Sequence, residues 1–178
     1  MIVLTREQHC LLAGIDVETF KSMKKRGQLP TTDYAKTPEG DRGYTPTSTL
    51  MLLIAIDLFY ACGLSRDSAA IIATAGNYAH RNWPAIASSS LLIAQGKPVE
   101  NPVMCGLVER TKHKAEAARQ YALSHNRHLS AFCGTVSDLA RLAPIGRMIC
   151  TNVSEIVARM RLAAERANID LEQFWREG

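Results

Sequence analysis

The chain has 178 residues, of which 47% are hydrophobic, so it can bury a core and is neither a disordered nor a fibrous protein. Its formal net charge of +4 permits an anionic partner without requiring one. Arg6 and Glu7 interrupt any signal-peptide-like start, and the longest apolar run, 50–56, is too short to cross a bilayer. We therefore expect a cytoplasmic protein of one or two domains with no membrane partner.

The first 27 residues predict two short helices joined by a tight turn. Thr5 is a good N-cap for a helix over 6–13, which Gly14 stops. Asp16 then caps a second helix, which ends at Gly27. This arrangement is typical of a helix–turn–helix.

The end of the second helix is strongly basic. Four positive charges fall within six residues, at Lys21, Lys24, Lys25 and Arg26. Residues 1–76 hold eight basic and eight acidic residues in all, so local clustering and not total charge distinguishes this helix. The segment 28–46 that follows is rich in Pro, Gly, Thr and Asp, which predicts a small hairpin or loop.

Helix, turn, basic helix and loop, in that order, predict a helix that enters a DNA groove. Hydroxyls and helix N-terminal amides suit phosphates, and the start of the second helix suits base edges. Cations at its end and in the loop, with a neighbouring phenol, suit the phosphate backbone or the minor groove. The expected DNA-binding residues are Thr5, Thr19, Lys21, Lys24, Lys25, Arg26, Lys36, Arg42 and Tyr44.

Two further helices complete the first part of the chain. Thr47 or Ser48 is expected to cap an apolar helix at about 49–62, and Ser65 to cap the next one, at 66–75. Because Gly76 and Asn77 close this unit, we place the domain boundary after residue 76.

The second part, 77–178, predicts a small mixed α/β domain. Trp83-Pro84 and the serines after it predict a break in any helix over 77–90. Short apolar segments predict strands at 90–94, 103–108, 128–133 and 148–151, the first two joined as a hairpin. Amphipathic patterns predict helices at 111–124 and 153–167, and Asp170 is expected to cap a short terminal turn.

Nothing in the sequence predicts an enzyme, a cofactor or a metal site. The widely spaced cysteines, Cys10, Cys62, Cys105, Cys133 and Cys150, form no pair at metal-finger spacing, so we interpret them as small buried side chains. Cys133 precedes a helix start at Thr135, which leaves a redox or ligand-sensing role as an alternative. His125 and His128 are interpreted as part of a solvated loop, and no catalytic motif occurs.

Several short motifs in residues 2–76 follow one another in a characteristic order. They are Leu11-Leu12-Ala13-Gly14-Ile15, Glu18-Thr19-Phe20-Lys21, Lys25-Arg26-Gly27-Gln28-Leu29-Pro30, Arg42-Gly43-Tyr44-Thr45-Pro46 and Gly63-Leu64-Ser65. In this order they resemble the winged helix–turn–helix domain of the MerR family. The resemblance implies a wing around 42–46, two helices that support it, and bending or untwisting of promoter DNA. Ser22 and Met23 replace the paired tyrosines of the family, and its metal-sensing cysteines are absent, so metal sensing is not expected.

We therefore expect an α+β protein with an N-terminal winged helix–turn–helix over 1–76, followed by a small mixed α/β domain over 77–178. The expected function is that of a sequence-specific double-stranded DNA-binding transcriptional regulator from a bacterium or mobile element, acting as a homodimer. Whether a small-molecule effector binds is left open. One alternative is an architectural, excisionase-like or phage DNA-packaging factor with the same module. The other is a ligand- or redox-sensing protein that acts through its C-terminal domain.

Overall fold

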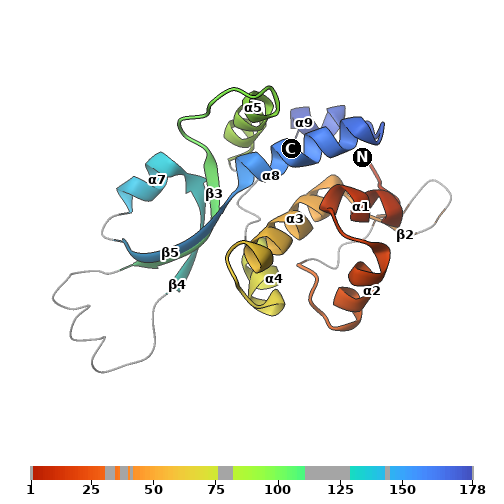
Figure 1. Cartoon of the computed structure of the whole chain (residues 1–178), viewed down its shortest axis with the longest axis horizontal. Coiled ribbons are helices and arrows are strands. Elements are labelled where there is room, and N and C mark those ends of the chain that lie inside the picture. The colour runs from red at the N-terminus through yellow and green to blue at the C-terminus, as the bar shows by residue number, and fades with distance from the viewer. Residues whose placement is uncertain are drawn as a thin grey trace.

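The computed structural model describes residues 2–30, 35–36, 40, 42–75, 82–110, 129–142 and 145–177, which form a mixed α+β fold (Figure 1). The first part contains α1 (Arg6–Ala13), α2 (Val17–Lys25), β1 (Ala35–Lys36), β2 (Arg42–Gly43), α3 (Pro46–Tyr60) and α4 (Arg66–Ala75). The second part contains α5 (Trp83–Ala94), β3 (Val103–Arg110), β4 (Leu129–Thr135), α7 (Val136–Arg141), β5 (Ile145–Asn152), α8 (Val153–Arg166) and α9 (Glu172–Glu177). The predicted α+β class is confirmed. Among the described residues, no helix combines the length and the apolar character that crossing a membrane requires.

Side-chain caps determine where α1 and α2 begin, as the sequence predicts. The Thr5 hydroxyl accepts the backbone N–H of Gln8 at 3.2 Å, and the Gln8 side chain accepts the backbone N–H of Thr5 at 2.9 Å. At the next helix Asp16 accepts the backbone N–H of Thr19 at 2.7 Å. Each cap satisfies amides that would otherwise lack a partner at a helix start.

A glycine sets the angle between α1 and α2. Gly14 has a φ of +69°, in the left-handed region that side chains rarely adopt, and it ends α1. The N–H of Ile15 then bonds back to the carbonyl of Cys10 at 3.1 Å, which closes the turn. After this turn α2 buries Phe20 and Met23 against the same core that holds α1.

A short antiparallel ribbon follows α2 and is attached to the start of α1. In the ribbon, Lys36 of β1 lies opposite Arg42 of β2. Tyr44, which comes directly after β2, pairs with Leu4 through two backbone hydrogen bonds of 2.7 and 2.9 Å. Since Leu4 leads into α1, the end of the ribbon lies beside the first helix.

The third helix starts earlier than predicted. Thr45, and not Thr47 or Ser48, is the N-cap of α3, and its hydroxyl accepts the backbone N–H of Ser48 at 3.1 Å. Pro46 occupies the first turn, where its missing N–H costs no hydrogen bond. The next cap is as predicted, because the Ser65 hydroxyl accepts the backbone N–H of Ser68 at the start of α4.

The second part is built on a three-stranded antiparallel sheet in the order β4-β3-β5. Helix α8 packs against α5, β3, α1 and α3, so it lies between the sheet and the N-terminal helices (Figure 1). At the centre of the sheet, a Cβ on Gly106 would stand only 2.0 Å from the carbonyl oxygen of Ile149. This close backbone approach requires glycine at position 106.

Two predictions for the second part are wrong, the strand at 90–94 with its hairpin to 103–108 and the helix break at Trp83-Pro84. Residues 90–94 belong to α5 and not to a strand, and Trp83-Pro84 starts this helix instead of preventing it. Pro84 is tolerated because it lies in the first turn, where helical amides have no intrahelical partner. The Ser88 and Ser89 hydroxyls donate to carbonyls four residues earlier, so the serine run is compatible with the helix.

The other predicted elements of the second part mostly occur. The strands β3, β4 and β5 match those expected at 103–108, 128–133 and 148–151. The helix α8, its N-cap Asn152 and a last short helix after Asp170 also match. The helix expected at 111–124 and the histidines at 125 and 128 lie outside the described residues.

The hydrophobic core continues across the predicted domain boundary. One cluster contains Leu58 of α3 together with Val103 of β3 and Ile156 and Met160 of α8, all of them fully buried. The division into 1–76 and 77–178 stays a prediction. Within the described residues, the two parts share a core.

Candidate nucleic-acid interface

Helix α2 separates its apolar and charged side chains onto different faces. Phe20 and Met23 are 1% and 5% exposed, whereas Lys21, Lys24 and Lys25 are exposed. Residues four apart lie on the same side of a helix, so Lys21 and Lys25 present two cations from one face. A helix with this distribution can bring charge to an anionic surface without exposing its core.

One of these lysines has an acidic neighbour. The Lys21 ammonium lies 2.7 Å from a carboxylate oxygen of Glu18, and the two side chains are 51% and 79% exposed. A pair this exposed contributes about 0–1 kcal/mol. A phosphate or a base edge can therefore replace Glu18 as the partner of Lys21 at little energetic cost.

The two predicted threonines both serve as parts of helix caps. The Thr5 hydroxyl is the N-cap acceptor of α1, and the Thr19 hydroxyl donates to the second oxygen of Asp16 at 2.7 Å. The backbone N–H of Thr19, and then this hydroxyl, hold the pKa of Asp16 below its usual range. Thr19 is half-buried, and its hydroxyl proton is already used. The structure therefore gives Thr19 a role in the helix cap. The sequence predicted only that Thr19 contacts the edges of DNA bases.

Tyr44 does not lie at the exposed tip of a loop. It is 3% exposed, its ring is stacked on that of His9 with the ring centres 4.3 Å apart, and it forms a T-shaped pair with Phe20 whose ring centres are 5.4 Å apart. The expectation that it contacts DNA as a surface phenol is therefore corrected, because its ring is part of the core. The sequence motif Arg42-Gly43-Tyr44 predicts an aromatic residue in the loop. The same motif gives no sign that Tyr44 pairs with Leu4.

The remaining predicted cations lie at the end of α2 and on the ribbon. Arg26 is exposed directly after α2, and Lys36 is exposed on β1. Arg42 lies opposite Lys36 in the ribbon. The contact between Tyr44 and Phe20 connects the end of this ribbon to α2.

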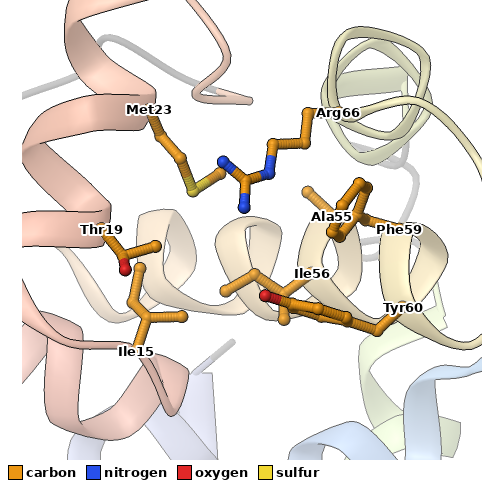
Figure 2. A pocket seen from close by; sticks show the side chains of 8 residues that line it. All are labelled: Ile15, Thr19, Met23, Ala55, Ile56, Phe59, Tyr60 and Arg66. Carbon is orange, nitrogen blue, oxygen red and sulfur yellow. The ribbon is translucent and has the colours of Figure 1, made fainter.

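A further cation, Arg66, lies across a hollow from α2, and it is not among the DNA-binding residues expected from the sequence. Figure 2 shows the Arg66 guanidinium pointing toward Met23 of α2, over a floor of apolar side chains from α3. The guanidinium also lies 4.8 Å from the centre of the Phe59 ring. In sequence Arg66 is an isolated arginine after a helix cap, so only the packing of α4 against α3 identifies its position.

Together these contacts connect α2 to the end of the ribbon on one side and to Arg66 of α4 on the other. The ribbon reaches α2 through the contact of Tyr44 with Phe20, and α4 reaches it through the hollow between Arg66 and Met23. In Figure 1, α2 accordingly lies between α4 and the end of the ribbon at β2. The arrangement presents a basic helix with further cations beside it, which is the charge pattern that a nucleic-acid backbone attracts.

The comparisons with known proteins add no assignment. No model of a known protein family matches the chain, and no curated protein matches its sequence. Within the ranges that the structure describes, no group of three or more His, Cys, Asp or Glu side chains could hold a metal ion. The resemblance of residues 2–76 to the MerR family remains an expectation from sequence motifs.

Proposed function

We propose that the chain binds double-stranded DNA with α2 in the major groove. The observation that carries this proposal is the geometry of α2. It follows a tight turn, buries Phe20 and Met23, and exposes Lys21 and Lys25 on one face. A major groove admits one α-helix, and side chains on the exposed face of that helix reach base edges.

The neighbouring cations then have distinct roles. Lys24, Lys25 and Arg26, at the end of α2, bind backbone phosphates beside the groove. Lys36 and Arg42 on the ribbon bind the phosphates or the minor groove on one side, as the wing of a winged helix–turn–helix of the MerR type. Arg66 on α4 adds a contact to a phosphate. Its guanidinium sits over Phe59 and is preorganised for that contact.

We further propose that the protein acts as a homodimer in transcriptional regulation. A single module of this size buries about 600–1,000 Å² on DNA, which is small for specific binding. Two copies on a palindromic site double that surface. Footprinting on the chain's own upstream region tests the regulatory role: protection that overlaps a promoter supports it. Protection of an attachment or packaging site would instead assign the protein to recombination or packaging.

The salt dependence of binding tests the phosphate contacts. We expect the double variant Lys24→Ala, Lys25→Ala to bind all duplexes more weakly and to reduce the slope of log K against log salt concentration by about 2, since each phosphate contact contributes about 0.9. Fluorescence anisotropy with a labelled duplex at several salt concentrations measures the slope.

A charge-matched variant on the second part serves as the control. Lys97→Ala with Arg141→Ala removes the same net charge from exposed positions after α5 and in α7. Its slope should equal that of the wild type within about 0.5. If both double variants change the slope equally, the effect comes from total charge and the assignment to α2 is wrong.

A further inference from the structure

Four of the five cysteines lie in or beside the central sheet, although they are far apart in sequence. Cys105 is in β3, Cys133 in β4 and Cys150 in β5, and Cys62 follows α3. The Cys62 thiol donates to the carbonyl oxygen of Cys150 at 3.8 Å, which brings the end of α3 to the sheet. All of them are free thiols. Their wide spacing in the sequence predicts small buried side chains, with a redox or ligand-sensing role as an alternative at Cys133, and gives no sign of this gathering.

Cys105 and Cys133 are positioned to form a covalent bond. They lie directly opposite each other in the antiparallel pairing of β3 and β4, so their side chains lie on the same face of the sheet. Opposite residues in such a pairing have Cα atoms about 4.5 or 5.5 Å apart, and a disulfide needs about 4.4–6.8 Å. A bond between these two sulfurs therefore needs no rearrangement of the sheet.

The two thiols have different surroundings. Cys133 is partly exposed, and the Asn82 side-chain amide donates to its sulfur at 3.9 Å and to its carbonyl oxygen at 3.3 Å. The hydrogen bond from Cys105, and then that from Asn82, lower the pKa of Cys133. Cys105 is 1% exposed, and its hydrogen bond to Cys133 together with burial raises its pKa. The less buried thiol is thus the better nucleophile, and the buried thiol beside it stays protonated.

We propose that Cys133 and Cys105 are a peroxide-oxidised dithiol, with Cys133 as the attacking residue and Cys105 as the resolving residue. The Cys133 thiolate attacks one oxygen of a hydroperoxide, the O–O bond breaks, and the other oxygen leaves with a proton as water or an alcohol. The Cys105 sulfur then attacks the Cys133 sulfenic acid, an S–S bond forms, and water leaves. Two thiols lose two electrons in total, and the peroxide gains them. A dithiol reductant breaks this disulfide and restores both thiols by thiol–disulfide exchange.

Cys62 and Cys150, the other two cysteines that lie close together, do not combine a lowered pKa with a neighbouring amide donor. Burial raises the pKa of Cys62, and burial likewise raises the pKa of Cys150 to about 11. Neither residue has an amide donor to its sulfur among the hydrogen bonds of the described residues. Cys62 and Cys150 are therefore expected to remain thiols while Cys133 reacts. The inference goes beyond the proposed DNA binding and does not depend on it.

Oxidation of the folded wild-type protein with a few equivalents of hydrogen peroxide tests the proposal. After quenching, unfolding and alkylation, intact mass spectrometry should show loss of two of the five alkylatable thiols, and peptide mapping should join Cys105 to Cys133. Treatment with dithiothreitol should restore all five. Retention of five thiols, or a disulfide that joins any other pair, would overturn the proposal.

Single variants then separate the two roles. Cys105→Ser should leave a sulfenic acid at Cys133 that dimedone traps, and Cys62→Ser, as the matched control, should form the Cys105–Cys133 bond at the wild-type rate. Asn82→Ala should slow oxidation about fivefold, because it removes one hydrogen bond to the thiolate. Dimedone labelling of Cys105 in a Cys133→Ser variant to the same extent as Cys133 in Cys105→Ser would contradict the assignment of the attacking residue.

Discussion

His9 carries no charge at neutral pH, although it lies in the part of the chain that we propose binds an anion. Burial lowers the pKa of His9 to about 4, and its Nδ1 lies 2.8 Å from the Thr49 hydroxyl oxygen. The ring is stacked on Tyr44, and a T-shaped contact with Phe20 completes an aromatic cluster. His9 therefore holds the start of α1 against α3 and contributes nothing to the charge of the interface.

This buried histidine makes the stability of the fold depend on pH. The unfolded chain takes up a proton at His9 near pH 6.5, and the native chain does so only near pH 4. Between these values the unfolded state binds more protons, so the free energy of unfolding falls as the pH falls. From pH 7 to pH 4.5 we expect a loss of about 2 kcal/mol from this residue.

Urea denaturation of the wild type and of His9→Phe at both pH values measures this contribution. Phenylalanine keeps a ring against Tyr44 and removes the titration, while all carboxylates titrate alike in the two proteins. The wild type should lose about 2 kcal/mol more than the variant on acidification. Equal losses would show that the pKa of His9 is the same in the native and the unfolded chain.

At the scale of single elements, the helix ends that depend on local caps could be predicted from the sequence. Thr5, Asp16, Ser65 and Asn152 each bond an amide in the first turn of their own helix. The start of α5 could not be predicted in this way, because its N-cap Asn82 makes no capping bond and turns its amide to Cys133, 51 residues later in the chain.

In the candidate site, too, features set by local sequence could be predicted and features set by long-range contacts could not. The charge face of α2 is a local pattern and could be predicted. The burial of Tyr44 depends on pairing with Leu4, and the position of Arg66 depends on how α4 packs. Contacts between segments that are distant in sequence decide both, and no short pattern contains them.

One buried hydroxyl adds a polar connection between α8, the sheet and α5 to the packing of this helix. The Ser154 hydroxyl accepts the backbone N–H of Val103 at 2.9 Å and lies 2.7 Å from the Ser89 hydroxyl, and Ser154 is fully buried. Ser154→Ala should lower the free energy of unfolding by about 1–3 kcal/mol, because the buried N–H of Val103 loses its acceptor.

Ser88→Ala is the matched control for this change, since it makes the same substitution at an exposed serine that bonds only within α5. It should change the free energy of unfolding by less than about 0.5 kcal/mol. Urea denaturation measures both variants. Similar effects of the two substitutions would mean that the bond between Ser154 and Val103 stabilises nothing.

At the scale of the whole molecule, an acidic residue joins the N-terminal helices to the second part. Asp57 of α3 lies 2.6 Å from the Arg159 guanidinium of α8 through one oxygen and accepts the Thr151 hydroxyl of β5 through the other. Because the core is also shared, we expect the α2 face to be held in a fixed orientation to the sheet.

The two bonds of Asp57 should differ in their contribution to stability. Asp57→Ala leaves the buried Thr151 hydroxyl without its acceptor and should lower the free energy of unfolding by about 1–3 kcal/mol. Arg159→Ala removes only a pair whose arginine is 54% exposed and should cost less than about 1 kcal/mol. If thermal or urea unfolding shows that Arg159→Ala lowers the free energy of unfolding more than Asp57→Ala does, the hydrogen bond between Asp57 and Thr151 is not the main stabilising contact of Asp57.

Duplex binding by the intact wild-type chain tests the central claim most directly. We would measure fluorescence anisotropy of labelled duplexes, selected from genomic fragments, between about 50 and 200 mM salt, the range over which phosphate contacts change affinity most visibly. The proposal predicts saturable binding that weakens steeply with salt, and a selected duplex bound at least about a hundredfold more tightly than its scrambled counterpart. If no duplex is bound even at the lowest salt concentration, α2 is not a DNA-binding helix.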